Sequence, residues 1–227
     1  MSIVTVRDVA RVYQSGGLPV RALDGVSLSI EPGEFTTLMG PSGSGKTTLL
    51  NIIGGLDEPD SGSVEIEGQT LSELSGAKLS RLRLERLGFI FQAYNLIPVL
   101  SAYENAEFVL MMRGMPEAER RSKVMATLKA VGLEGMEDRR PNQLSGGQQQ
   151  RVAVARAIAG EPALVLADEP TANLDSKTSD GLIELMKRLN EEQGITFVFS
   201  THDPKVMNAA KRVVRMLDGK IESEERR

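Results

Sequence analysis

The first third of the chain contains several runs in which apolar and polar residues alternate. Residues 3–9 and 20–30 alternate in this way and predict two strands, with a loop over residues 15–19 between them. Residues 35–39 form a short β-prone run, and residues 63–68 alternate again. This pattern is typical of strands that bury one face, so we expect the chain to begin with β-structure.

The pattern changes between residues 93 and 160, where alternation gives way to apolar residues spaced three and four apart. Residues 102–112 and 117–131 show this spacing, which predicts helices, and a further helix is expected to end at Gly160. We interpret residues 93–160 as a helical subdomain inserted into an α/β core formed by residues 1–92 and 161–227. Together they make one domain.

Strands without alternation are expected on both sides of the helical part. Residues 163–167 are a continuous apolar run, the type found in parallel strands that are buried on both faces, and residues 88–91 and 195–200 are also expected to form buried strands. A helix is expected over residues 179–192. Residues 212–222 predict a terminal hairpin, and we expect the tail after it to be solvated and frayed.

Residues 40–47 match G-x-x-x-x-G-K-[ST] at every constrained position, between a predicted strand and a predicted helix. The glycines let the backbone wrap with its N–H groups inward, and the helix adds the positive end of its dipole. A glycine-rich turn that binds nothing is the alternative, but the complete motif favours a phosphate-binding loop. Lys46 is expected to reach the β- and γ-phosphates, and the Thr47 hydroxyl to ligate Mg²⁺. The candidate phosphate-binding residues are Gly40, Pro41, Ser42, Gly43, Ser44, Gly45, Lys46, Thr47 and Thr48.

A second glycine segment, Leu144-Ser145-Gly146-Gly147-Gln148, stands directly before a predicted helix. A hydroxyl, free N–H groups and a helix dipole at one place suit an anion. An ordinary serine cap followed by flexible glycines explains the same residues without a ligand, so both interpretations stay open on these residues alone.

Polar residues follow several of the predicted buried strands. Asp168 and Glu169 follow one strand, where Asp168 is placed to hold Mg²⁺ and Glu169 to polarise the attacking water. Gln92 follows another strand and is either solvated or within reach of the metal or the water. His202, the single histidine, is either a surface or satisfied core residue or a contact to the γ-phosphate. Tyr13, at the end of the first strand, either packs half-buried or stacks on a base.

Composition narrows the function classes. The 27 basic and 31 acidic residues give a net charge of −4, without the basic excess expected of a nucleic-acid-binding protein. The absence of cysteine excludes disulfides, a thiol catalyst and thiolate metal sites. The first residues do not resemble a signal peptide, and no apolar run approaches the roughly 20 residues that span a bilayer. We therefore expect a protein made in the cytosol that reaches a membrane only through a partner.

Taken in chain order, these motifs resemble the nucleotide-binding subunit of ATP-binding cassette (ABC) transporters, over nearly the whole chain. Residues 40–47 match the Walker A loop, Asp168 and Glu169 the Walker B pair, and Leu144 to Gln148 the LSGGQ motif. In the remaining motifs, Tyr13 lies where the base-stacking aromatic lies, Gln92 matches the Q-loop glutamine, Asp175 ends the D-loop over residues 172–175, and His202 matches the switch histidine. LSGGQ followed by this histidine is far more specific than Walker A alone.

The resemblance implies an α/β fold: a P-loop NTPase (RecA-like) core with a mixed sheet, an N-terminal antiparallel β-subdomain and an inserted helical subdomain. It also implies an active ATPase that forms a head-to-tail homodimer around two ATP and Mg²⁺, with no other metal. Glu169, His202, Gln92 and Lys46 are then catalytic, and Thr47, Gln92 and Asp168 surround the metal. Ser145, Gly146, Gly147, Gln148 and Asp175 belong to the nucleotide contacts, with the LSGGQ residues closing over the ATP of the other copy.

Finer features resemble the macrolide-exporter and lipoprotein-releasing ATPases, which work with inner-membrane permeases. They include Gly16-Gly17, Asn95-Leu96-Ile97-Pro98 and Tyr103-Glu104-Asn105. This resemblance implies a peripheral protein on the cytoplasmic face of the inner membrane, with the apolar surface near residues 93–115 receiving the permease. Simple helical core explains the same apolar residues. Two other functions remain: an ABC-type mechanical regulator that transports nothing, and a soluble ABC ATPase of DNA repair or translation, which the charge balance disfavours.

Overall fold

A computed structural model describes the chain from Met1 to Arg227, except for the side chain of Ser15. The amino-terminal part forms an antiparallel four-stranded sheet with the strand order β2-β1-β4-β5. Its strands are β1 (Val4–Ser15), β2 (Leu18–Ile30), β4 (Ser61–Ile66) and β5 (Gln69–Thr70). The predicted antiparallel β-subdomain is therefore present.

A second sheet has the order β10-β9-β3-β8-β7-β6 and is parallel except for its edge strand β10. Its strands are β3 (Phe35–Met39), β6 (Leu87–Ile90), β7 (Leu164–Asp168), β8 (Thr196–Thr201), β9 (Arg212–Leu217) and β10 (Lys220–Arg226). Every residue of β8 is buried, including its hydroxyl residues Thr196, Ser200 and Thr201, as expected for an inner parallel strand. The predicted mixed sheet is confirmed.

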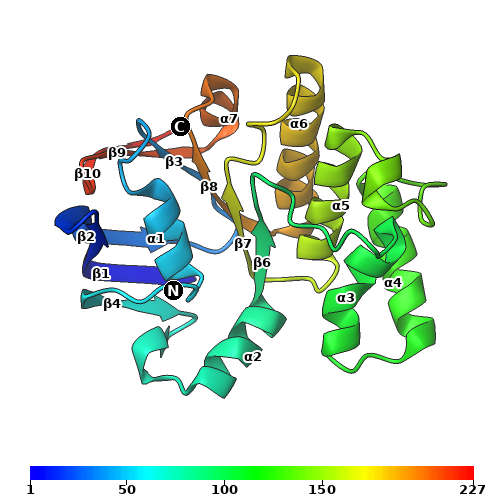
Figure 1. Cartoon of the computed structure of the whole chain (residues 1–227), viewed down its shortest axis with the longest axis horizontal. Helices are drawn as coiled ribbons and strands as arrows, with labels where there is room; N and C mark the ends of the chain where they lie inside the picture. The colour runs from blue at the N-terminus through cyan, green and yellow to red at the C-terminus, as the bar shows by residue number, and fades with distance from the viewer.

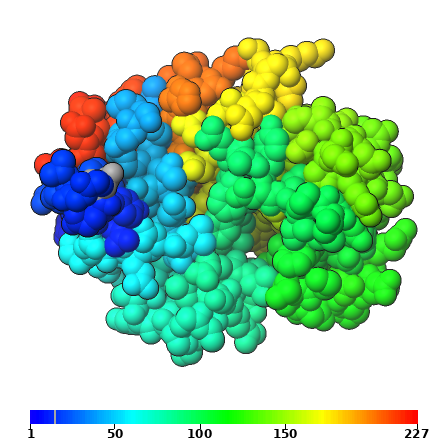
Figure 2. Space-filling model, viewed as in Figure 1, coloured from blue at the N-terminus to red at the C-terminus, as the bar shows by residue number. Residues whose placement is uncertain are grey.

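The helices cover this second sheet on both faces. They are α1 (Lys46–Ile53), α2 (Gly76–Arg86), α3 (Ala102–Met112), α4 (Glu117–Ala130), α5 (Gly146–Ile158), α6 (Ser176–Gln193) and α7 (Pro204–Ala209), with short 3₁₀ turns at Leu71–Glu73 and Pro141–Gln143. Helix α1 contacts strands of both sheets and lies between them (Figure 1). Helices α3, α4 and α5 form a lobe at one side of the molecule, coloured green to yellow-green in Figure 2.

Two hydrophobic cores hold the sheet in place. One fills the space between the sheets and contains the buried side of α1, including Leu49 and Ile52. The other lies on the opposite face of the parallel sheet, where Phe35 and Phe199 pack with their ring centroids 4.6 Å apart, and it continues without a break into the helical lobe. The lobe is therefore packed onto the core of the domain through shared apolar contacts.

Two local predictions were wrong, and one short helix was missed. The loop expected over residues 15–19 is a two-residue turn, because Gly16 and Gly17 adopt φ of 58° and 83°, which lets both strands continue to a tight hairpin. The tail is not frayed: it forms most of β10 and pairs with β9, and Arg212 donates to Glu224 at 2.7 Å. Helix α7 was not expected, since six residues are too few to show a helical period.

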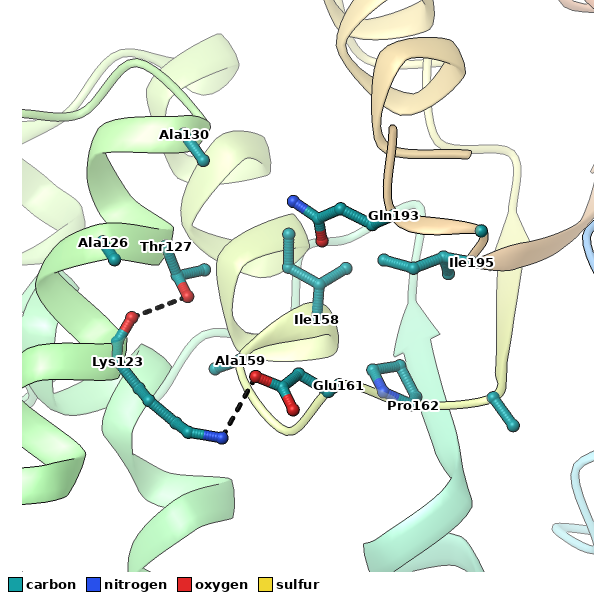
Figure 3. A pocket seen from close by; sticks show the side chains of 12 residues that line it. Lys123, Ala126, Thr127, Ala130, Ile158, Ala159, Glu161, Pro162, Gln193 and Ile195 are labelled. Carbon is teal, nitrogen blue, oxygen red and sulfur yellow. Dashed lines mark hydrogen bonds and ion pairs between the residues drawn. The ribbon is translucent and has the colours of Figure 1, made fainter. Parts of the chain in front are cut away.

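A groove of about 520 Å³ opens where β7 and β8 begin, between α4, the end of α5 and the end of α6 (Figure 3). The ion pair between Lys123 and Glu161, at 3.0 Å, bridges part of its rim. All of the polar residues singled out in the sequence lie away from this groove, which therefore takes no part in the candidate site. Among the described residues, no helix combines the length and the apolar character needed to cross a membrane.

Candidate functional site

The loop over residues 40–45 connects β3 to α1 and is pressed closely against its neighbours. Gly43 and Gly45 have φ of 80° and 99°, in the left-handed region that favours glycine. A Cβ atom on Gly40 would lie 2.2 Å from the carbonyl oxygen of Met216, and one on Gly45 would lie 2.4 Å from that of Ala22. The glycines are therefore required by close packing against β9 and β2 as well as by backbone conformation.

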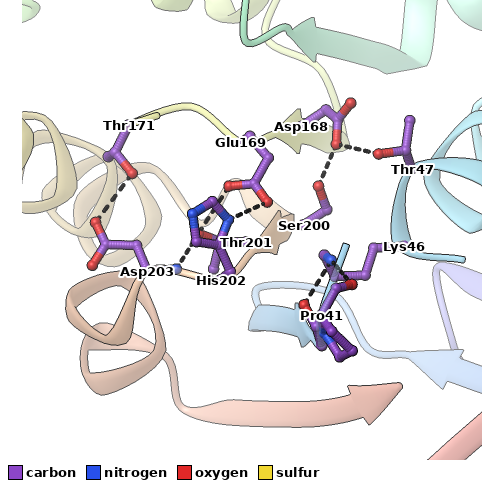
Figure 4. A network of polar contacts seen from close by, with 11 residues as sticks. Pro41, Lys46, Thr47, Asp168, Glu169, Thr171, Ser200, Thr201, His202 and Asp203 are labelled. Carbon is purple, nitrogen blue, oxygen red and sulfur yellow. Dashed lines mark hydrogen bonds and ion pairs between the residues drawn. The ribbon is translucent and has the colours of Figure 1, made fainter. Parts of the chain in front are cut away.

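Lys46, the first residue of α1, is buried and turns its ammonium group back into this loop. Its Nζ donates to the carbonyl oxygens of Gly40 and Pro41 at 2.8 and 2.9 Å (Figure 4). The buried Ser44 hydroxyl has no hydrogen-bond partner among the described residues. A fixed cation, a free hydroxyl and the amino end of a helix thus meet at one place, which suits a phosphate group.

Thr47 and Asp168 come from different elements and meet beside this loop. The Thr47 hydroxyl donates to Asp168 Oδ1 at 2.9 Å, and the Ser200 hydroxyl donates to the same oxygen (Figure 4). Asp168 ends β7 and is in register with Ser200 on β8, so the parallel pairing determines this contact. Hydroxyl and carboxylate oxygens are the ligands that Mg²⁺ prefers, and the pair fits that ion.

Glu169 and His202 form a second pair next to the first. Glu169 has φ of 45°, an unusual conformation for this residue type, and its N–H donates to the carbonyl oxygen of Ser200 at 3.0 Å. Its Oε1 lies 2.9 Å from His202 Nδ1, and the Thr201 hydroxyl donates to its Oε2 at 3.4 Å. The carboxylate is only 16% exposed and the imidazole 70% exposed, so the glutamate is held by neighbours while the histidine faces outward.

The second glycine segment forms a helix cap. Ser145 Oγ accepts from the N–H of Gln148 at 3.3 Å, and Gln148 Oε1 accepts from the N–H of Ser145 at 2.9 Å, which makes a capping box at the start of α5. A Cβ on Gly147 would lie 2.3 Å from Thr178 Cγ2 on α6. Figure 1 shows β7 and β6 between this helix start and the phosphate loop, so the fold does not bring the two glycine segments together within one chain.

Gln92 and Asp175 are exposed residues at the same edge of the sheet. Gln92 follows β6, and its carbonyl oxygen accepts from Asn173 Nδ2 at 2.9 Å. Asp175 caps α6 and accepts from the Thr178 hydroxyl at 2.6 Å; hydrogen bonds from this hydroxyl and from the Thr178 N–H lower the pKa of Asp175. Among the described residues, neither the Gln92 nor the Asp175 side chain forms a hydrogen bond with Lys46 or Thr47.

Tyr13 does not contact the phosphate loop, but it lies close enough to the loop to meet the base of a nucleotide bound there. Ala22, which touches Gly45, stands two residues from Val20, and Val20 is paired with Tyr13 across the β1–β2 hairpin. Strands lie about 4.8 Å apart and rise about 3.3 Å per residue, so these steps place Tyr13 roughly 8 Å from Ala22. Its hydroxyl donates to Asp57 at 2.5 Å, beyond the far end of α1.

Sequence reasoning missed the hydroxyls of Ser200 and Thr201, which hold Asp168 and Glu169 in place. The available signal was the position of these two polar residues between the apolar run of β8 and His202. Among the described residues, no group of three or more acidic, histidine or cysteine side chains is placed to hold a metal alone.

Comparison with known proteins identifies the family. The family model described as "ABC transporter" matches residues 23–172. An uncharacterised ABC transporter ATP-binding protein of Thermotoga maritima is 46% identical over 99% of this chain and 96% of its own. A macrolide export ATP-binding/permease protein, MacB, of Syntrophobacter fumaroxidans is also 46% identical over 99% of this chain, which spans only 32% of that longer protein.

A solved structure gives the same result. The ATP-binding cassette MJ0796, a protein of Methanocaldococcus jannaschii, was solved as a dimer in a post-hydrolysis state bound to ADP and Pi, and it superposes with a TM-score of 0.91 at 46% identity over 98% of both chains. The family model covers residues 23–172, and relatives that align over nearly their whole length are 46% identical. The chain therefore belongs to the ABC transporter family, as one of its ATP-binding, ATP-hydrolysing cassettes.

Proposed function

We propose that this chain hydrolyses Mg²⁺-ATP at the site around Lys46 and thereby drives a permease in the membrane. The observation that carries the proposal is the contact of Thr47 with Asp168 directly beside the phosphate loop. It joins an oxygen donor pair suited to Mg²⁺ with a cation suited to phosphate. We propose an exporter or a lipoprotein- or macrolide-type translocation system, and the names of the MacB relatives, which refer to macrolide export, support the macrolide type.

In this proposal, Lys46 and the N–H groups of residues 40–48 hold the β- and γ-phosphates. Thr47, Asp168 and Gln92 are the residues that would hold Mg²⁺, which neutralises charge on the phosphate oxygens. Glu169 accepts a proton from the attacking water, and His202 donates to a γ-phosphate oxygen. The Glu169–His202 contact at 2.9 Å keeps base and donor at adjacent positions.

The nucleotide contacts are completed by a second copy of the chain. Ser145, Gly146, Gly147 and Gln148 lie at the amino end of α5, apart from the phosphate loop of their own chain, so we place them over the ATP of the partner, with Asp175 at the interface. A two-fold dimer makes both sites equivalent. The dimeric MJ0796 structures support this arrangement.

Replacing Ser145 by arginine is expected to leave ATP binding to the monomer within about twofold and to lower turnover at least about 100-fold, the usual effect of losing a donor to the reacting group. The large side chain blocks closure of the two copies. ATP-dependent dimerisation, measured by light scattering in a Glu169→Gln background, should disappear as well. Ser75→Arg is the control, because Ser75 caps α2 in the same way, so this change removes a cap, at a cost of about 1 kcal/mol, and adds the same bulk away from the LSGGQ residues. Normal turnover in Ser145→Arg would contradict the shared site.

We place the permease in a groove of about 300 Å³ between α2, β6, α3 and α5, where α2 meets the green lobe in Figure 2. Its lining residues include Leu56, Arg83, Phe89, Phe91, Val109 and Arg156. Beside it, the predicted apolar surface divides into two parts: Ala102, Ala106 and Leu110 are core, whereas Val99, Phe108, Met111 and Met112 are exposed. Such an apolar surface suits a helix from a partner.

The charges in this groove indicate what that helix carries. Arg83 donates to the carbonyl oxygen of Gly55 at 2.6 Å, and Arg156 donates to those of Tyr94 and Asn95. Among the described residues, neither arginine forms an ion pair, and burial lowers the pKa of Arg156. We therefore propose an apolar permease helix that bears a carboxylate, docked from the cytoplasmic face of the inner membrane, with the chain bound peripherally.

The test is to tag the Glu169→Gln chain, solubilise host membranes with ATP and Mg²⁺, and identify the co-purified proteins by mass spectrometry. A permease is expected, and Leu56→Asp should lower its recovery at least tenfold, because a charge is placed in the apolar groove. Leu18→Asp is the matched control, since Leu18 is 71% exposed on the distant β1–β2 hairpin. Equal recovery with Leu56→Asp contradicts the groove. Recovery of soluble proteins only contradicts the membrane role, and a permease that moves no substrate would indicate a mechanical regulator.

A further inference from the structure

The ring of Tyr13 is held by two charged residues for which the proposed function has no role. Arg11 and Tyr13 stand two positions apart on β1, and the guanidinium carbon of Arg11 lies 4.9 Å from the centroid of the Tyr13 ring. This cation–π contact covers one face of the ring. At the rim of the ring, the Tyr13 hydroxyl donates to Asp57 Oδ2 at 2.5 Å.

Asp57 connects these two contacts. Its other oxygen, Oδ1, accepts from Arg11 Nη2 at 2.8 Å, so one carboxylate holds both the hydroxyl of the ring and the cation above it. Asp60 accepts from Arg11 Nη1 at 2.9 Å and anchors the far side of the guanidinium. Burial alone raises the pKa of Asp57, but hydrogen bonds from Tyr13 and the Glu58 N–H, together with the charge of Arg11, lower it, so the carboxylate stays ionised.

The cluster of Arg11, Tyr13, Asp57 and Asp60 lies within the length of a nucleotide from the phosphate loop. Tyr13 lies about two residues and one strand away from Ala22, whose carbonyl oxygen touches Gly45. A nucleotide with its phosphates in the loop extends over a comparable length. The face of Tyr13 that Arg11 leaves open is therefore within reach of the base.

We infer that Asp57 and Arg11 are positioning residues for nucleotide binding: they fix the Tyr13 ring so that its open face receives the base. This inference rests on the proposed nucleotide site. A ring already held by its hydroxyl and by a cation loses less freedom when the base stacks on it, and this pre-organisation increases affinity. The contribution depends on the base, so it is absent for a ligand that consists of phosphates alone.

The experiment compares Mg²⁺-ATP with Mg²⁺-tripolyphosphate by isothermal titration calorimetry on the full chain. Asp57→Asn is expected to raise the Kd for ATP about three- to tenfold and to leave the Kd for tripolyphosphate unchanged. Tyr13→Ala should give the same selective loss, and Asp57→Asn should add nothing in the Tyr13→Ala background, because both changes act through one ring. Glu58→Gln, on the neighbouring carboxylate, is the matched control and should bind both ligands normally.

An equal loss of affinity for both ligands would show a general structural role and overturn the inference, as would an unchanged Kd for ATP. Arg11→Lys provides a second variant that keeps the charge but loses the two-pronged contact, and it should show the same selective loss where Asp57→Asn does not fold. Failure of the unaltered chain to bind either ligand is a different result, because it contradicts the nucleotide site itself and the inference with it.

Discussion

Replacing Glu169 by glutamine is expected to lower ATP turnover by about 10²- to 10⁴-fold while ATP binding stays close to that of the unaltered chain. The amide has nearly the same size as the carboxylate but cannot take a proton from the attacking water. The backbone of this residue is already held by the Ser200 carbonyl at 3.0 Å, so we expect the loop to keep its shape. Phosphate release and nucleotide affinity, measured on the same preparation, check both parts of the prediction.

Glu161→Gln is a suitable control for Glu169→Gln. Glu161 is also a glutamate in the left-handed region, with φ of 51°, but it lies by the groove at the opposite edge of the sheet. Any cost of placing glutamine in this conformation appears in both variants, whereas the loss of a base appears in one. Turnover at the unaltered rate in Glu169→Gln, measured with the permease present, would remove this carboxylate from the mechanism.

Replacing Lys46 by alanine is expected to raise the Kd for ATP by about 10- to 100-fold, since charge-assisted hydrogen bonds contribute roughly 1.5–3 kcal/mol each. Turnover at a fixed ATP concentration should fall further, because the same ammonium group stabilises charge on the phosphate during reaction. Lys205→Ala is the control: Lys205 lies near His202 in the chain but is paired with Asp180 at 2.7 Å. Circular dichroism separates loss of binding from loss of folding, and unchanged ATP affinity in the folded variant would exclude the phosphate role.

The core of the fold could be predicted because its signals are local. Continuous apolar runs mark the parallel strands, and the residues that end them, such as Asp168 and His202, meet at one edge because parallel strands share their direction. The phosphate loop was equally accessible, since its chemistry lies within eight consecutive residues. In contrast, the tail was wrongly predicted to be frayed because charged residues without an apolar period look solvated, and only pairing with β9 orders them.

The contacts that sequence reasoning missed depend on register. Ser200 reaches Asp168 only because the two residues are paired across β7 and β8. Hydroxyl residues are common inside strands, so the sequence alone did not mark Ser200 as part of the site. Asp57 lies in a connection that the sequence marks only as a break, and it meets Tyr13 because β1 is paired with β4. No pattern of residue spacing along the chain predicts such a contact.

Helix α5 begins beside Ser145 and carries Arg156 near its other end. Its thirteen residues make a helix about 20 Å long. Arg156 donates hydrogen bonds to the carbonyl oxygens of Tyr94 and Asn95, which follow Gln92 closely in the chain. In the proposed dimer, one end of this helix lies on the partner's nucleotide, and the other end holds the segment that follows Gln92 in its own chain. We therefore expect α5 to couple the two sites, so that a change of nucleotide at one site shifts the equilibrium at the other.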